Sequence, residues 1–340
     1  MKKAISIILF WQLLLMAVAE DGSRLWLRSS LPTDVVETPV LLFVPNDLSA
    51  DATQTVQLAA NELRNHWFEA PVKLRLTSDE GSLAKERDSD IYRNSDTDGN
   101  RTADGFRIEK GDTISVSAET ANGLLYGAYF LLRAQGMGDG CLCQIMHTVT
   151  SMDQTPRSNI RALYVPEGMD DILKRGRLQD FARANASIGI NGIILPPVES
   201  HQSISKTLAL YGIQVYAADT MAEEALTDTL WLEDVPNWCG SHLAQFEWYK
   251  AGRMLWNPDL TLQQVAYEWL AQTFSDVPLF IRPAMEILFH LGEASAEECE
   301  HMAETWQQLQ DYVDSRRHYE IELEIESMAE DIESMAEDEE

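Results

Sequence analysis

The sequence predicts a mixed α/β protein, and three observations support this fold class. Apolar residues form 45% of the 340-residue chain, which is enough for at least one sizeable core. Short apolar, β-prone runs alternate with amphipathic helical spacing through residues 20–135. From residue 158 onward a strand–helix order repeats at the spacing of parallel βαβ units, and after residue 246 helical spacing dominates. We therefore expect an N-terminal α/β sandwich domain, a parallel α/β unit and a C-terminal helical segment.

The first nineteen residues predict a cleaved export signal. Lys2 and Lys3 give a basic start, residues 4–15 are almost unbroken apolar sequence, and Ala17-Val-Ala19 fits the small-x-small cleavage rule. The apolar run is shorter than the roughly 20 residues that span a bilayer. We expect a mature protein that begins near Glu20, is secreted or periplasmic, and has no membrane span.

Residues 20–135 predict a sheet with helices packed against one face. Apolar runs at two places read as strands, a pair of alternating segments reads as a hairpin with a Lys110-Gly-Asp112 turn, and two stretches carry the apolar stripe of an amphipathic helix. In chain order these are a strand at 40–44, a helix at 51–67, a strand at 72–76, the hairpin at 105–117 and a helix at 122–133.

The remainder divides into a linker, a parallel unit, helices and a tail. Glycines and Pro156 indicate a linker at 136–157. Within 158–245 we predict strands at 160–165, 192–195 and 213–217, separated by helices at 178–188 and 204–211. Helical spacing continues through 246–320, with Thr261 as a helix N-cap. The acidic tail, 321–340, repeats one seven-residue sequence, which indicates a solvated, frayed helix or a recent sequence accident.

Charge and cysteine usage exclude several classes of function. Acidic residues outnumber basic ones by 55 to 26, for a formal net charge of −29, so the chain repels phosphate backbones and we expect no nucleic-acid partner. The four cysteines are too few for a disulfide-built scaffold. The sequence holds no Cys-x-x-Cys pair and no His-Glu-x-x-His helix, so it predicts no metal site.

Several stretches resemble one known family, in the same order along the chain. The resemblance is weaker at Gly123-Leu-Leu-Tyr-Gly-Ala128 and stronger at Ala186-Ser-Ile-Gly-Ile-Asn-Gly-Ile193. It is strongest at Asn237-Trp-Cys-Gly-Ser-His-Leu-Ala-Gln245 and in the following residues up to Leu260. These motifs resemble the xylan α-glucuronidases of glycoside hydrolase family 67, and together the matches cover most of residues 20–275.

The resemblance implies an exported enzyme with a (β/α)8 (TIM) barrel. Such an enzyme removes glucuronic or 4-O-methylglucuronic acid from xylan-derived (aldouronic) oligosaccharides by inverting acid–base hydrolysis, and it needs no cofactor. A (β/α)8 barrel takes about 250 residues, whereas residues 158–245 hold three βα units and an exit segment. We therefore expect a truncated barrel remnant at 158–245, without the segment that carries the catalytic carboxylates, and we assign no catalytic residue.

The remaining rim of the barrel also departs from the family. Tyr164-Val-Pro-Glu-Gly168 stands where the family has an Asn-His-Trp-Asp-Asn motif, and Pro196 and Pro197 replace an Asn pair. Both changes remove hydrogen-bonding groups from the substrate face. Glu167, Glu199 and Asp219 follow the three predicted strands; they are either a new acid–base pair or solvated loop acids.

The resemblance implies a sugar-binding role for a small set of residues. Trp238 is the best candidate for a flat apolar wall against a pyranose ring, with Asn237 and His242 as polar neighbours; the alternative is a core tryptophan. Arg161 either holds a uronate carboxylate bidentately or is structural. At the level of function, the sequence predicts an α-glucuronidase with impaired or lost activity. The alternatives are a non-catalytic carbohydrate-binding or interaction protein, or a decayed remnant.

Export gives the first testable prediction. Mass spectrometry of the protein recovered from outside the cytoplasm should find Glu20 at or near the N-terminus, because the basic start, apolar run and Ala-x-Ala site form a complete signal. A cytoplasmic protein that keeps Met1 would contradict the prediction.

Overall fold

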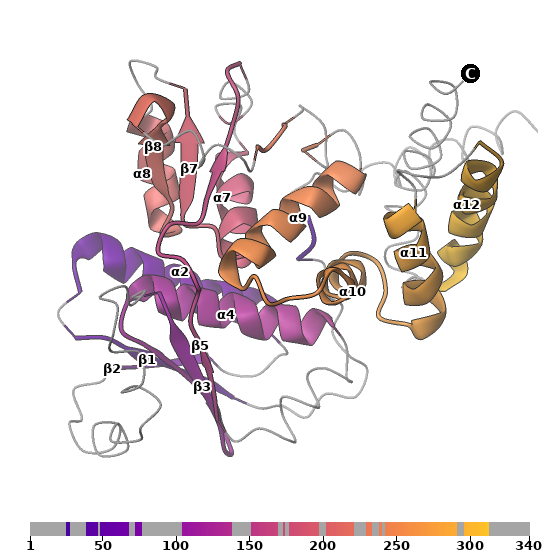
Figure 1. Cartoon of the computed structure of the whole chain (residues 1–340). Coiled ribbons are helices and arrows are strands. Elements are labelled where there is room, and N and C mark those ends of the chain that lie inside the picture. The colour runs from indigo at the N-terminus through magenta and orange to yellow at the C-terminus, as the bar shows by residue number, and fades with distance from the viewer. Residues whose placement is uncertain are drawn as a thin grey trace, which may run out of the picture.

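The computed structural model describes most of the chain outside the two ends and several connecting segments. The described residues are 25–27, 39–46, 48–67, 72–76, 104–137, 151–168, 173, 177–196, 202–220, 229–232, 238–239, 242–290 and 296–312. The predicted signal at 1–19 and the acidic tail at 321–340 lie outside these residues. The described part is a mixed α/β structure with two sheets, as predicted (Figure 1).

The N-terminal sheet contains five strands in the order β2-β1-β4-β3-β5. β1 pairs in parallel with β2 and β4, while β3 pairs antiparallel with β4 and β5. Their alternating burial shows why the apolar alternation predicted the hairpin: Phe106, Ile108, Ile114 and Val116 all point into the core. The strands are β1 (Val40–Val44), β2 (Val72–Leu76), β3 (Phe106–Lys110), β4 (Ile114–Ala118) and β5 (Ser151–Gln154).

Two helices cover one face of this sheet, α2 (Ala50–His66) and α4 (Ala121–Gly136) (Figure 1). The side chains of Ser49 and Thr120 cap them by accepting hydrogen bonds from backbone N–H groups of the first turn. A Cβ on Gly127 would lie 2.5 Å from a methyl group of Val116, so α4 needs glycine there to approach the sheet closely.

The position of β5 corrects the predicted linker. Residues 151–154 lie inside the range 136–157 but form an edge strand, with Ile108 opposite Met152. The strand reads Ser-Met-Asp-Gln, so it lacks the apolar alternation that marks a half-buried strand. An ion pair between Arg107 and Asp153 across the two strands, 3.3 Å long, replaces apolar packing there.

The second sheet is parallel and contains β6 (Ala162–Tyr164), β7 (Gly192–Leu195) and β8 (Gln214–Ala217) in that order. α7 (Leu178–Ser187) connects β6 to β7, α8 (Gln202–Leu210) connects β7 to β8, and a 3-10 turn (Ala218–Thr220) follows. A later segment adds to the other side of β6. Thr229 forms a parallel bridge with Tyr164, and the Leu230 N–H donates to the Tyr164 carbonyl at 2.7 Å.

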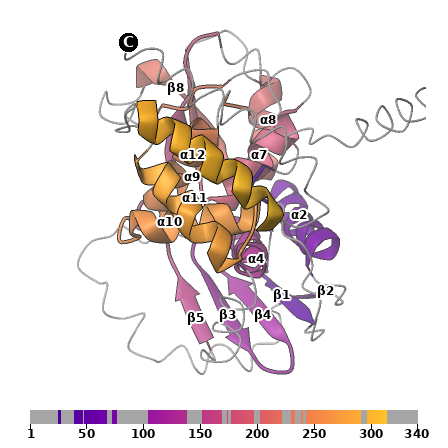
Figure 2. The same cartoon turned by 90° about the vertical axis from the view of Figure 1, so that its right-hand side faces the viewer.

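The C-terminal part is helical. α9, α10, α11 and α12 pack against one another in succession (Figure 2). Thr261 caps α10 in a capping box with Gln264, which confirms the predicted N-cap. None of the described helices is long and apolar enough to cross a bilayer. The bounds are α9 (His242–Trp256), α10 (Leu262–Thr273), α11 (Pro278–His290) and α12 (Ala296–Leu309), followed by a 3-10 turn (Gln310–Tyr312).

An aromatic cluster joins the N-terminal residues to the parallel unit and to α9. The Trp26 ring packs edge-to-face on Trp248 and Tyr249, with ring centroids 5.0 and 5.2 Å away. The indole N–H of Trp26 donates to the Ser187 hydroxyl at 2.8 Å, and that of Trp248 donates to the Asn185 side chain at 3.1 Å. The indole N–H groups of Trp26 and Trp248 therefore both have an acceptor on α7, and the bond from Trp248 ties α9 to that helix.

Buried ion pairs connect the same units. Arg183 on α7 donates through Nε to both carboxylate oxygens of Glu62 on α2, at 2.9 Å. Glu268 on α10 accepts from Arg253 on α9 at 2.7 Å and lies 4.0 Å from Arg133 on α4. Removal of one partner would leave a buried charge uncompensated, so these pairs hold the helices in one arrangement.

Glu268 gives a prediction about stability and pH. Burial opposes its charge, but Arg253 and Arg133 outweigh that effect and hold the pKa of Glu268 below its usual range. A pKa lower in the folded than in the unfolded state contributes stability above the unfolded value, about 4.3, and this stability is lost as the pH falls through the folded value. Glu268→Gln should lower the free energy of unfolding at pH 7 by about 3–5 kcal/mol and reduce the further loss of stability as the pH falls below about 5.

Urea unfolding as a function of pH measures both effects. Glu247→Gln is the matched control, because the Glu247–Lys250 pair on α9 is more exposed, and exposed pairs contribute about 0–1 kcal/mol. Equal losses in the two variants would show that the buried carboxylate does not hold the helices together.

Candidate functional site

The carboxyl ends of β6, β7 and β8 form the first candidate site, because parallel α/β folds place their chemistry beyond the carboxyl ends of the strands. Glu167 follows β6 and Asp219 follows β8, and both side chains are exposed. Within the described residues neither carboxylate has a hydrogen bond or an ion pair. Glu199 lies outside the described residues. We call this edge, with Tyr164, Glu167, Asp219 and Trp231, the rim.

Trp231 is a rim residue that sequence reasoning missed. It follows Leu230, whose N–H bonds to the last residue of β6, and its side chain is 62% exposed. An exposed indole offers a flat apolar surface on which a sugar ring can stack. The sequence places Trp231 in an irregular, Trp-rich stretch, and only its pairing with β6 and its exposure distinguish it from the buried tryptophans.

Trp238 lies in the core of this structure, although it was the leading sugar-binding candidate. Its side chain is fully buried, its ring centroid is 5.8 Å from that of Phe181, and the Arg177 guanidinium lies over the ring at 4.2 Å. No face of the ring is open to a pyranose. Asn237 lies outside the described residues, as does the side chain of His242, which begins α9.

Arg161 is also fully buried, and its donors are committed to the protein. The guanidinium donates to the Gly189 carbonyl at 2.6 Å, to the Ser158 carbonyl at 2.7 Å and to the Asp104 carboxylate at 2.8 Å. It also lies 5.1 Å from the Trp256 ring centroid. Asp104 takes the place that a uronate carboxylate would need, so Arg161 joins the N-terminal domain to the parallel unit.

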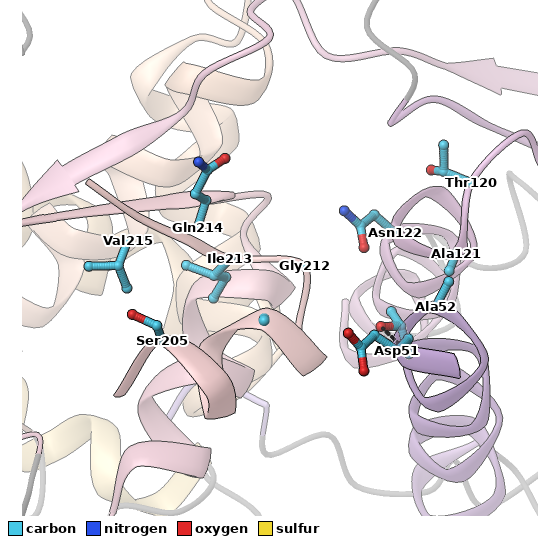
Figure 3. A pocket seen from close by; sticks show the side chains of 12 residues that line it. Asp51, Ala52, Thr120, Ala121, Asn122, Ser205, Gly212, Ile213, Gln214 and Val215 are labelled. Carbon is cyan, nitrogen blue, oxygen red and sulfur yellow. Dashed lines mark hydrogen bonds between the residues drawn. The ribbon is translucent and has the colours of Figure 1, made fainter. Parts of the chain in front are cut away.

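The second candidate site is a pocket between the N-terminal helices and the parallel unit (Figure 3). Its volume is about 510 Å³. Figure 3 shows Asp51 and Asn122 on one side, facing Ser205, Gly212 and Gln214 on the other. The lining residues come from the N-terminal parts of α2 and α4, from α8 and from the start of β8; they are Asp51, Ala52, Thr55, Thr120, Ala121, Asn122, Ser205, Ala209, Gly212, Ile213, Gln214 and Val215.

Local geometry fixes how α4 meets β8 at this pocket. Gly212 has φ +71°, a conformation that favours glycine, and a Cβ there would lie 2.5 Å from Oδ1 of Asn122. Thr55 donates to the Leu210 carbonyl at 3.0 Å, which ties α2 to the end of α8. The pocket is therefore built by a close approach of α2, α4 and the consecutive pair α8 and β8, three parts of the chain that are distant in the sequence.

Comparison with known proteins confirms the family resemblance over one segment. Residues 239–294 match the family described as glycosyl hydrolase family 67 C-terminus. This segment starts one residue after Trp238 and contains α9, α10 and α11. No curated protein matches the sequence.

The chain is also similar to solved glycosidase structures. One is a GH115 4-O-methyl-α-glucuronidase with specificity for decorated arabinogalactans (12% identity, TM-score 0.38, 53% of this chain and 29% of that one). Another is a GH138 enzyme targeting pectin rhamnogalacturonan II (11% identity, TM-score 0.32, 69% of this chain and 37% of that one). A third is an inactive mutant of a GH20 exo-β-N-acetylglucosaminidase from Vibrio harveyi (9% identity, TM-score 0.27, 58% of this chain and 36% of that one). The chain spans only 29–37% of the length of these structures.

The burial of Arg161 yields a stability prediction. Arg161→Met removes the buried charge that pairs with the Asp104 carboxylate, which then keeps only the donor from Asn191, and it leaves the Gly189 and Ser158 carbonyls without their guanidinium donor. Urea unfolding should therefore show a loss of about 3–5 kcal/mol. Arg157→Met is the control, because its pair with Asp259 is exposed on both sides and should contribute at most about 1 kcal/mol. Unchanged stability of Arg161→Met, together with lost affinity for glucuronic acid, would instead indicate a uronate-binding role.

Proposed function

We propose that this chain is a carbohydrate-active protein derived from a family 67 xylan α-glucuronidase, and that it binds xylan-derived oligosaccharides without hydrolysing them. The observation that carries the proposal is the family 67 C-terminal segment at residues 239–294, which begins nine residues after Leu230, where the chain pairs with β6. The predicted export signal would place this activity in the periplasm or outside the cell.

The strand order supports descent from a closed barrel. In a closed (β/α)8 barrel the last strand lies beside the first, so the ring has no edge. Here Thr229 and Leu230, just before the family 67 segment, lie parallel to β6, the first strand of the parallel unit. The order of 229–230, β6, β7 and β8 is that of a last strand followed by the first three, with the middle of the barrel missing.

The chemistry of inverting glycosidases argues against hydrolysis at the rim. Such enzymes place a protonated carboxylic acid opposite a carboxylate base, with roughly 6.5–9.5 Å between them for the attacking water. Glu167 and Asp219 are both exposed and follow strands that β7 separates, and no contact within the described residues holds one carboxylate opposite the other. The resemblance implies that the family's carboxylates come from the middle and later strands, and we expect no counterpart of those strands in this chain.

Binding makes a smaller demand on the rim. Stacking needs one accessible ring, and Trp231 is 62% exposed beside the end of β6. Hydrogen bonds from sugar hydroxyl groups to exposed carboxylates such as Glu167 would add to this stacking. The rim therefore keeps an arrangement that suits a weak glycan-binding surface.

Two measurements test the proposed function. The purified protein should release no glucuronic acid from aldouronic oligosaccharides. It should bind them, and Trp231→Ala should lower the affinity roughly two- to twelvefold, the effect of about 0.5–1.5 kcal/mol from one aromatic contact. Leu279→Ala, which removes a similarly exposed apolar side chain on α11, should leave the affinity unchanged.

Two results would contradict the proposal. Release of glucuronic acid that is abolished by Glu167→Ala or Asp219→Ala would show that a new acid–base pair has formed on the rim. Absence of measurable binding to any aldouronic oligosaccharide would remove the binding role.

A further inference from the structure

We propose that the pocket between α2, α4, α8 and β8 is a second carbohydrate site, and that it binds a neutral oligosaccharide such as an unsubstituted xylan fragment. The assignment of a sugar rests on the proposed function, whereas the preference for a neutral ligand comes from the pocket itself. The site is distinct from the rim. Gly212 to Val215 lie at the amino end of β8, whereas Asp219 follows its carboxyl end, and four strand residues span about 13 Å.

The dimensions and walls of the pocket suit a small ligand. Its volume of about 510 Å³ falls within the roughly 300–1,000 Å³ of small-molecule sites. Ile213 and Val215 form an apolar wall from the β8 side, and Ala52, Ala121 and Ala209 add small apolar surfaces from the helices. A pyranose presents a C–H face and a rim of hydroxyl groups, and this mixture matches walls that are apolar in patches.

The pocket also contains polar side chains that the protein does not use. Asp51, Asn122 and Ser205 line it, and their side chains form no hydrogen bond within the described residues. They offer a carboxylate, an amide and a hydroxyl, which together accept and donate hydrogen bonds. Sugar hydroxyl groups are both donors and acceptors, so one ring could satisfy all three.

The charge of the pocket selects against a uronic acid. The described lining residues include Asp51 but no Lys, Arg or His. The side chains of Ser49 and Thr120 each accept from one N–H of the first turns of α2 and α4, which leaves fewer backbone donors there for a carboxylate. The net charge of −29 adds to the repulsion. A glucuronosyl group therefore suits this pocket less well than an uncharged pentose unit.

A titration of the full chain with xylotriose, followed by methyl NMR, measures binding in the pocket separately from binding at the rim. The Ile213 and Val215 methyl signals should shift with xylotriose and not with glucuronic acid at the same concentration, whereas the Trp231 indole signal reports the rim. Ser205→Tyr fills the pocket from α8, so the xylotriose affinity measured from the Ile213 and Val215 methyl signals should fall at least tenfold. Ser203→Tyr is the matched control, because Ser203 lies on the same helix, is exposed and does not line the pocket.

Two further variants keep the test decisive. Ala209→Tyr fills the pocket one turn later on α8 and should act like Ser205→Tyr, including in the case where Ser205→Tyr does not fold. Asp51→Asn should weaken xylotriose binding several-fold, because hydrogen bonds to a carboxylate are stronger than those to an amide. Trp231→Ala should leave the Ile213 and Val215 response intact.

The outcomes separate the two proposals. Suppose that Trp231→Ala does not change the affinity for aldouronic oligosaccharides, while xylotriose still shifts the Ile213 and Val215 methyl signals. The rim proposal would then be wrong and the pocket proposal would stand. The pocket proposal fails if xylotriose at millimolar concentration does not shift the two methyl signals. It also fails if the filling variants bind as well as Ser203→Tyr, or if glucuronic acid produces the same shifts.

Discussion

The arrangement of the units depends on how α4 is covered. Apart from Asn122 and Phe130, every residue of this helix is buried, and a helix that is buried on all sides must be packed on all sides. The five-stranded sheet covers one side, and α2, α7 and α10 contact the helix elsewhere. This packing sets the positions of both candidate sites. α4 forms one wall of the pocket, and α7, which packs on α4, connects two strands of the parallel sheet whose carboxyl ends form the rim.

The parallel sheet shows how an open α/β unit limits its exposed edges. A sheet edge presents unpaired backbone groups, and short edge strands reduce that hazard. β8 has four residues, while the outer side of β6 is occupied in part by Thr229 and Leu230. The side of β6 that a closed barrel would use is thus the side that has a partner here, which ties the rim residue Trp231 to the sheet.

Local sequence patterns predicted most of the elements, and tertiary packing decided the site. The alternation at 105–117 and the capping residue Thr261 were sufficient for the hairpin and for the start of α10, because these signals are local. β5 was missed because its polar residues carry no apolar period. The role of Arg161 could not be predicted, since its acceptor Asp104 lies 57 positions away and on another unit.

The same reason explains the two tryptophans and the pocket. Trp231 and Trp238 are seven positions apart in an irregular stretch, and only the packed structure exposes the first and buries the second. The pocket joins residues from three parts of the chain, and each of them reads in the sequence as an ordinary helix end or strand start. No local pattern marks such a meeting point.

The position of α10 in the chain has a consequence for synthesis. Tyr267 donates to the Met137 carbonyl across 130 positions, and Glu268 meets Arg133 beside it. A ribosome therefore releases all of α4 long before the residues that complete its cover exist, and contacts of such long range form slowly. The cover that α10 gives to α4 is therefore the last part of this packing to form, after the final third of the chain has been synthesised.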